Sequence, residues 1–189
     1  MRRTLAYIIG VALGDGNLSN PNGRAMRLRI TCDARYPRIA QEIIDGLKAL
    51  FPENSVSVYY RPNKSTYFNI SVYSNKLATL MPWKVGEGTK EMQSPRIPQW
   101  VRDNDSYARA CIRGLIQTDG SIYQDRGYVM INFTNNIESL ATDVKTILGR
   151  LGYRPTISRT HNPSGSFKYT VRVARDAQKL IRSLDLFKA

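Results

Sequence analysis

The chain has 189 residues, 42% of them hydrophobic, with a mean hydropathy of −0.38 and a net charge of +13. No apolar run reaches the roughly 18 residues of a membrane span, so we expect an unprocessed intracellular protein, cytoplasmic or organellar, with no membrane partner. The basic excess is shared between both halves. It favours a polyanion such as nucleic acid as the partner over a ribosomal-type or merely soluble basic protein.

Cysteine and histidine are too scarce and too scattered for a zinc site. Cys32 and Cys111 stand outside any Cys-x-x-Cys pair, and His161 is the single histidine of the chain. We expect Cys32 at a core-facing strand position, Cys111 buried inside a helix, and His161 in a loop.

The first half begins with a mostly apolar, helix-like run that ends in Asp15-Gly16. After a turn around residues 20–23, apolar and polar residues alternate, which predicts a strand with Leu28, Ile30 and Cys32 on its core face. An amphipathic helix and another alternating strand follow, with core residues Ile39, Ile43, Leu47 and Leu50 and then Phe68, Ile70 and Val72. A last helix is predicted over residues 74–81.

The same pattern returns after residues 82–104, whose prolines, glycines and mixed charges are typical of a linker. Residues 112–120 repeat residues 8–16, again ending in Asp-Gly, and a shift of 101 carries the later patterns of the first half onto the second. Asn104 or Asp105 is placed to cap the second motif helix, and the final helix is predicted over 175–187. The predicted organisation is a first half over 1–81, a linker over 82–104 and a second half over 105–189.

Small residues at matching positions of the two motif helices would let these helices pack backbone to backbone; they are Gly10, Gly14, Gly114 and Thr118. The aspartates are harder to explain, because a carboxylate at a helix C-terminus opposes the helix dipole at a cost of about 0.3–1 kcal/mol. Divalent cations would neutralise Asp15 and Asp119. Hard oxygen donors suit Mg²⁺, which activates water for phosphodiester hydrolysis. Ordinary Asp-Gly turn residues remain the alternative at this point.

The two Asp-Gly phrases resemble the paired signature of the LAGLIDADG homing endonucleases, in the single-chain form with two motifs. The middle glycine and the final Asp-Gly agree in both copies. Leu13 and Gln117 replace the first aspartate of the consensus, and Arg113 and Thr118 replace small alanines. The resemblance covers nearly the whole chain and implies an α+β fold. Its pseudo-two-fold duplicated αββαββα repeat would form an antiparallel β-sheet saddle over DNA, with helices on the opposite face.

The resemblance also implies a function. It is that of a monomeric, Mg-dependent endodeoxyribonuclease, a hydrolase that cuts both strands of double-stranded DNA at a long, specific site in intron homing. Mn²⁺ would be able to replace Mg²⁺, and Ca²⁺ would bind without supporting cleavage. The residues implied are catalytic Asp15 and Asp119, the same two with Gly14 and Thr118 as the metal site, and Asn135 and Arg175 around it.

Under the shift of 101, Ala34 and Ser74 stand in the first half where Asn135 and Arg175 stand in the second, so the surroundings of the metals are expected to be asymmetric. The main alternative function is an intron RNA maturase or a DNA-binding regulator on the same fold, without cleavage. Retention of both aspartates favours cleavage. An unrelated basic RNA-binding structural protein would leave the repeated phrases unexplained.

The period of two along each strand separates a core face from an open face. The open face carries arginines, tyrosines and small hydrogen-bonding side chains but almost no acids, and such side chains suit the reading of base edges. Lys64 and His161, near hairpin tips, are expected to reach flanking phosphates. The expected DNA contacts are Ser19, Arg27, Arg29, Ser57, Tyr59, Arg61, Asn69, Ser71, Tyr73, Tyr123, Asn132, Thr134, Thr156, Ser158, Lys168, Thr170 and Arg172.

Overall fold

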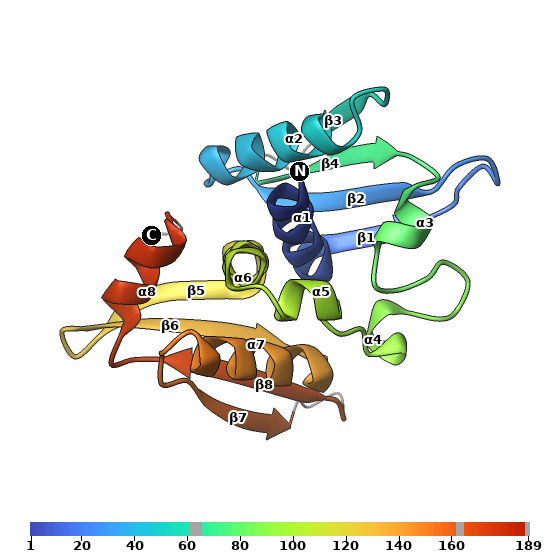
Figure 1. The fold of residues 1–189 in the computed structure, drawn as a ribbon. Helices are drawn as coiled ribbons and strands as arrows, with labels where there is room; N and C mark the ends of the chain where they lie inside the picture. Colours follow the sequence, from blue (N-terminus) through green and yellow to red (C-terminus); the bar gives the residue numbers. More distant parts are fainter. Residues whose placement is uncertain (61–65, 162–164, 188–189) are drawn as a thin grey trace.

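The computed structural model describes residues 1–60, 66–161 and 165–187, and one order of elements occurs in it twice (Figure 1). The first half contains α1 (Arg2–Asp15), β1 (Gly16–Ser19), β2 (Arg27–Asp33), α2 (Pro37–Leu50), β3 (Val56–Tyr60), β4 (Tyr67–Tyr73) and α3 (Leu77–Leu80). The second contains α6 (Asp105–Asp119), β5 (Gly120–Asp125), β6 (Tyr128–Asn135), α7 (Glu138–Arg150), β7 (Thr156–His161), β8 (Phe167–Val173) and α8 (Ala177–Leu184). The α+β fold predicted from the repeat is confirmed.

Each half folds its four antiparallel strands into one sheet, in the order β1-β2-β4-β3 and β5-β6-β8-β7. The alternation of the sequence explains which face is buried: Leu28, Ile30 and Ile70 have no exposed surface, and their polar neighbours lie on the other face. Helix α2 packs against the first sheet and α7 against the second (Figure 1). Each sheet therefore keeps one face covered by helices and one face open.

The strand pairing corrects one part of the repeat. Cys32 of β2 lies opposite Phe68, and Asn135 of β6 lies opposite Tyr169, so β2 corresponds to β6 through a shift of 103 rather than 101. The shift of 101 still relates Phe68 to Tyr169 and the start of α2 to the start of α7. The first half has two more residues than the second between β2 and α2, and hydrophobic alternation alone does not reveal where they lie.

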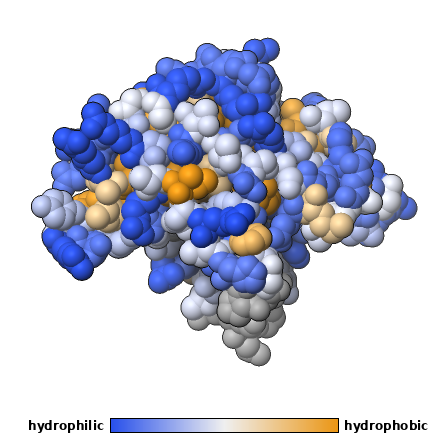
Figure 2. Space-filling model, turned by 90° about the horizontal axis from the view of Figure 1, so that it is seen from below, coloured by the Kyte–Doolittle hydropathy of each residue, from blue (hydrophilic) through white to orange (hydrophobic). Residues whose placement is uncertain are grey.

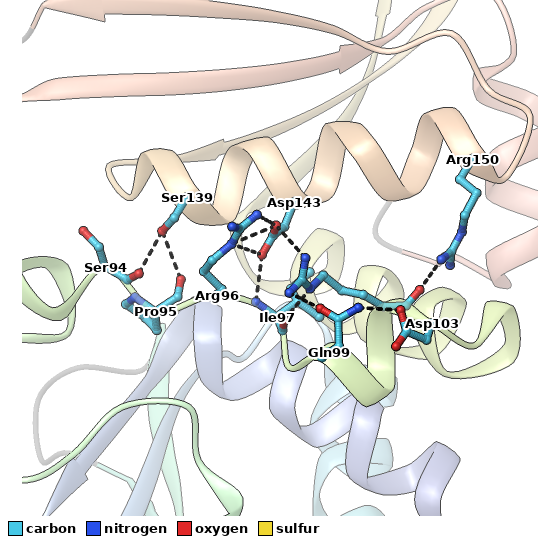
Figure 3. Close-up of polar contacts among 10 residues, drawn as sticks. Ser94, Pro95, Arg96, Ile97, Gln99, Asp103, Ser139, Asp143 and Arg150 are labelled. Carbon is cyan, nitrogen blue, oxygen red and sulfur yellow. Dashed lines mark hydrogen bonds and ion pairs between the residues drawn. The ribbon is translucent and has the colours of Figure 1, made fainter.

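The segment between the halves is folded, although its composition predicted a linker. It forms α4 (Lys90–Gln93) and α5 (Gln99–Arg102) and buries Trp83, Ile97 and Val101. Asp143 of α7, 1% exposed, fixes the segment to the second half (Figure 3). Its carboxylate accepts a hydrogen bond from Ile97 N at 3.0 Å and pairs with the Arg96 guanidinium.

Several smaller predictions have clear outcomes. The terminal helices, predicted over 74–81 and 175–187, are shorter and form α3 and α8. Asn104 caps α6, where its side chain accepts a hydrogen bond from Tyr107 N at 3.1 Å. Cys32 and Cys111 are buried as expected. His161 was wrongly predicted in a loop, because β7 continues to that residue and its ring packs against Phe167. Among the described residues, the helices are too short or too polar to cross a membrane.

Candidate active site and DNA interface

The two motif helices, α1 and α6, lie side by side between the sheets and touch through their backbones (Figure 1). A Cβ atom added to Gly10 would lie 2.1 Å from the Cys111 carbonyl oxygen, and one added to Gly114 would lie 2.6 Å from the Tyr7 carbonyl oxygen. A Cβ at Gly14 would meet the Thr118 hydroxyl at 2.0 Å. Only glycine permits so close an approach at these three positions. The residues predicted at the helix interface, Gly10, Gly14, Gly114 and Thr118, therefore lie where the two helices meet.

The contact brings the C-terminal ends of the two helices together. The Cγ of Asp119 lies 3.4 Å from the Cβ position of Gly14, the residue that precedes Asp15. Both helices stop at the glycine after the aspartate, where Gly16 and Gly120 take extended backbone conformations and begin the first strand of each sheet. The two carboxylates therefore belong to one site at the junction of the halves.

A residue that sequence reasoning missed also reaches this site. Lys90, the first residue of α4, donates hydrogen bonds from its Nζ to the carbonyl oxygens of Leu13 at 2.7 Å and Gly14 at 2.6 Å. The carbonyl oxygens of Ala12 and Gly16 lie 3.3 and 3.2 Å from the same nitrogen. The ammonium thus satisfies carbonyls that a helix end leaves without partners.

The positive charge of Lys90 interacts with the negative charges of both aspartates. Burial lowers the pKa of Lys90, and the negative charges of Asp119 and Asp15 oppose that lowering. Lys90 therefore supplies part of the neutralisation of the carboxylates, for which the sequence pointed to metal ions alone. No motif marked this lysine, because it follows a glycine-rich stretch that was interpreted as linker.

Asn135 lies where the resemblance placed it, beside an aspartate. Its Nδ2 donates to Asp119 Oδ2 at 2.6 Å, and its Oδ1 accepts from Ile137 N at 2.8 Å, so both ends of the amide are held. Arg175 lies exposed between β8 and α8. The corrected register also changes the first-half counterpart of Asn135, which is Cys32 and not Ala34.

Cys32 shares the surroundings of Asp15. Burial raises the pKa of the Cys32 thiol to about 12, with a further contribution from the charge of Asp15. A cavity of 380 Å³ opens beside the two residues and is lined also by Thr31, Thr118 and Ser121. This cavity leaves room next to the Asp15 carboxylate for a larger group than a thiol.

The donor set at the helix ends fits a hard divalent cation. It includes the carboxylates of Asp15 and Asp119, which are the oxygen donors that Mg²⁺, Mn²⁺ and Ca²⁺ prefer, whereas the nearby Gly14 carbonyl accepts a hydrogen bond from Lys90. Among the described residues, no cluster of three or more histidines, cysteines and acids occurs that would hold a metal unaided. Further ligands would have to come from water or a bound phosphate.

The residues expected to read DNA share the open faces of the sheets. The register aligns them in rows across the strands, such as Arg29, Ser71 and Ser57 in the first sheet and Asn132, Arg172 and Thr156 in the second. Those that are exposed are Ser57, Tyr59, Tyr73, Thr156, Ser158, Lys168 and Arg172. Those that are partly covered are Ser19, Arg27, Arg29, Ser71, Tyr123, Asn132, Thr134 and Thr170.

Asn69 lies on the expected face but is only 8% exposed, because the strands on either side cover it and Thr31 Oγ1 donates to its Oδ1 at 3.0 Å. Arg61 and Lys64 lie outside the described residues. The Nε of Arg29 is buried and has no hydrogen-bond partner among the described residues. Seen from below, the molecule is mostly hydrophilic, with apolar side chains scattered over it (Figure 2).

Comparison with known proteins agrees with this architecture. Residues 106–188 match the LAGLIDADG-like domain family. The chain is 27% identical to a tRNA-splicing ligase RtcB of Methanopyrus kandleri over 176 residues, which cover 82% of this chain and 18% of the relative. It is 27% identical to a DNA polymerase of Thermococcus hydrothermalis over 159 residues, which cover 83% of this chain and 9% of that protein. The chain thus spans less than a fifth of either relative.

Solved structures share the fold over the full length of the chain. I-DmoI, a homing endonuclease solved in complex with DNA and Mn, has a TM-score of 0.70 and 23% identity, with 97% of this chain and 96% of that chain covered. Full-length DUF199/WhiA has a TM-score of 0.69 and 12% identity, with 99% and 56% covered. Residues 106–188 thus match the LAGLIDADG-like domain family, and the first half of the chain repeats the fold of that region.

Proposed function

We propose that the protein is a site-specific endonuclease that cuts both strands of double-stranded DNA with a divalent metal, Mg²⁺ in the first place. The observation that carries the proposal is the junction of the helices, where the Asp119 carboxylate lies against Gly14 and next to Asp15. Open sheet faces rich in hydrogen-bonding side chains extend from that junction in both halves. A net charge of +13 favours a polyanion as the substrate.

The residues of the junction suit phosphodiester hydrolysis. Asp15 and Asp119, with the backbone at Gly14 and Thr118, would hold the metal, whose chemistry is to activate water and stabilise the leaving oxygen. Asn135 keeps the Asp119 carboxylate in one orientation. Lys90 contributes a positive charge at the end of α1, where a phosphate would otherwise meet two carboxylates and the negative end of a helix dipole.

The sequence relatives support a mobile origin. The chain matches short stretches of two enzymes with different activities, a tRNA-splicing ligase and a DNA polymerase. A segment shared by enzymes that have no activity in common is expected when an endonuclease sequence has entered several genes. We infer that this chain serves intron or intein homing. A single chain that supplies both aspartates needs no second copy, so we expect a monomer on its DNA target.

A DNA-binding regulator without cleavage is the second candidate. DUF199/WhiA shares the fold over 99% of this chain, so the fold is not confined to proteins that are named as homing endonucleases. Both motif aspartates are present here, however, and a protein that only binds DNA has no use for paired carboxylates near phosphates. We therefore rank cleavage first.

The experiment uses purified protein, Mg²⁺ and a randomised pool of duplex DNA, from which cleaved sequences are recovered. We expect one long target, cut on both strands, and loss of at least about 1,000-fold in rate for Asp15→Asn and Asp119→Asn, as when metal-held catalytic groups are removed. Binding to the recovered target should persist in both variants. Selective binding by the wild-type protein without any cutting would favour the regulator, and cutting that survives in both variants would remove the aspartates from the mechanism.

A further inference from the structure

A groove lies between the two halves, at the ends of α1 and α6 that point away from the aspartates. Its cavity measures 1060 Å³ and is lined by the start of α1, one side of α2, the first turns of α6 and the end of the chain after α8. The lining residues of α1, from Arg3 to Tyr7, precede Asp15 by eight to twelve residues, which is about 12–18 Å along a helix. The groove is therefore separate from the site at the helix ends.

The acids of this groove are already engaged. Arg113, which stands where the motif has a small alanine, pairs with the Glu42 carboxylate of α2 at 3.0 Å and with the Asp185 carboxylate at 3.2 Å. Asp45 accepts a hydrogen bond from Gln41 Nε2 at 2.9 Å. Arg113 thus neutralises acids from both halves and leaves the charges of the other arginines in the groove uncompensated.

Those arginines are Arg3 of α1, Arg38 of α2 and Arg109 of α6. Among the described residues, none of the three forms an ion pair. Guanidinium groups bind phosphates through paired N–H donors, so three of them around one cavity favour a ligand with several phosphates.

Two further features favour an anionic occupant. The N-terminus of α1 borders the groove and has neither a side-chain cap nor an acid in its first turn, so its amide groups and dipole favour a negative charge. Tyr7 is 6% exposed, and its hydroxyl is buried without a hydrogen-bond partner among the described residues. Burial and the charge of Glu42 raise the pKa of Tyr7, so the hydroxyl keeps its proton and can donate a hydrogen bond to an occupant of the groove.

The remaining lining suits a nucleoside. The Arg38 guanidinium lies 4.3 Å from the centre of the Phe187 ring, and planar bases stack on arginine and aromatic side chains of this kind. The Asp45 carboxylate can accept hydrogen bonds from ribose hydroxyls. It would repel a continuous run of phosphates or an acidic peptide, which favours a single nucleotide over either polymer.

We propose that the groove binds a nucleoside triphosphate, with the phosphates at Arg3 and Arg109 beside the N-terminus of α1 and the base at Arg38 and Phe187. A cavity of 1060 Å³ lies at the upper end of the size range of small-molecule sites and accommodates such a ligand. Because both halves contact it, the nucleotide would hold α1 and α6 together from the end opposite the aspartates. The site does not depend on the proposed endonuclease function.

The test is a calorimetric titration of ATP into the full chain, with EDTA present so that metal ions at the aspartates play no part. Arg109→Ala should lower the affinity roughly 10- to 100-fold and Tyr7→Phe roughly 3- to 10-fold, as expected for the loss of a guanidinium contact and of one hydroxyl donor. Inorganic triphosphate should bind more weakly than ATP. Phe187→Ala should lower the affinity for ATP and leave that for triphosphate unchanged.

A matched control is Arg2→Ala, because Arg2 lies in the first turn of α1 but does not line the groove. This variant should bind ATP as the wild-type protein does. Tyr7→Phe removes a hydroxyl without a partner, so urea unfolding should give the wild-type free energy. Wild-type affinity in both Arg109→Ala and Tyr7→Phe, or an equal loss in Arg2→Ala, would overturn the proposal.

Competition separates the groove from the open sheet faces. ATP binding should persist in an excess of duplex DNA, and displacement of ATP by the duplex would mean that ATP binds where DNA does, against the proposal. Displacement by single-stranded RNA or by an acidic peptide would assign the groove to that partner instead. None of these titrations measures cleavage, so the nucleotide site and the endonuclease function stand or fall separately.

Discussion

Replacement of Gly10 by alanine tests the closest contact between the halves. The added Cβ would lie 2.1 Å from the Cys111 carbonyl oxygen, whereas a comfortable contact needs about 3.5 Å, so α1 and α6 would have to move apart by about 1 Å. Overpacking of this kind costs about 1–3 kcal/mol, and the contacting atom here is backbone, which cannot rotate away. Alanine regains somewhat less than 1 kcal/mol of helix propensity. We expect a net loss of about 2 kcal/mol and a melting temperature lower by roughly 4–8 °C.

The assay is urea unfolding followed by circular dichroism, with Gly149→Ala as the control. Gly149 lies in α7, where an added Cβ would meet nothing within 4 Å, so that variant should be slightly more stable than the wild-type protein. Gly10→Ala should also slow DNA cleavage, because the separation moves Asp15 relative to Asp119. If Gly10→Ala is as stable as Gly149→Ala and cuts at the wild-type rate, the backbone contact does not hold the two carboxylates together.

Three further outcomes are expected. Lys90→Met should lower the cleavage rate by roughly 10- to 100-fold while Lys90→Arg loses less, as judged by single-turnover kinetics, because only the charge-keeping variant offsets the carboxylates. Asp143→Ala should lower the free energy of unfolding by about 3 kcal/mol in urea titrations, since it leaves Ile97 N without its acceptor and an arginine pair without its counter-charge. The free energy of unfolding should fall as the pH rises above 9. The thiols of Cys32 and Cys111 have raised pKa values in the folded protein, so they ionise first in the unfolded chain. Each thiol should then lower the free energy of unfolding by about 1.4 kcal/mol per pH unit. Urea midpoints measured from pH 8 to 11 check the last point, and Cys111→Ala should make the fall less steep.

The duplication and the positions of the two aspartates could be predicted from the sequence, because both appear as local patterns that require no knowledge of the tertiary structure. Period-two alternation at Leu28 and Ile30 defines a strand and its core face, and the repeated Asp-Gly defines two helix ends. The glycines four residues apart also indicated which faces of the helices would meet, and the contacts at Gly10 and Gly14 are of that kind.

Other features depend on distances that no local pattern records. The shift of 103 for β2 could not be found from alternation, since a slip of two residues leaves every side chain on the same face. Lys90 is one lysine in a glycine-rich stretch, and only the fold of that stretch against α7 brings its ammonium to α1. Asn69 was placed on the correct face, but its burial results from neighbouring strands that the sequence does not position.

The closest part of the α1–α6 contact involves main-chain atoms and glycines, so its demands on the sequence are confined to a few small residues. Such a joint tolerates independent changes in the hairpins on either side, because the base-reading residues that the structure describes form their hydrogen bonds within their own half. Halves taken from different proteins of this architecture should therefore combine into working hybrids, each bringing recognition of its own part of a composite target. The folded segment that carries Lys90 and is anchored by Asp143 would then have to travel with the second half.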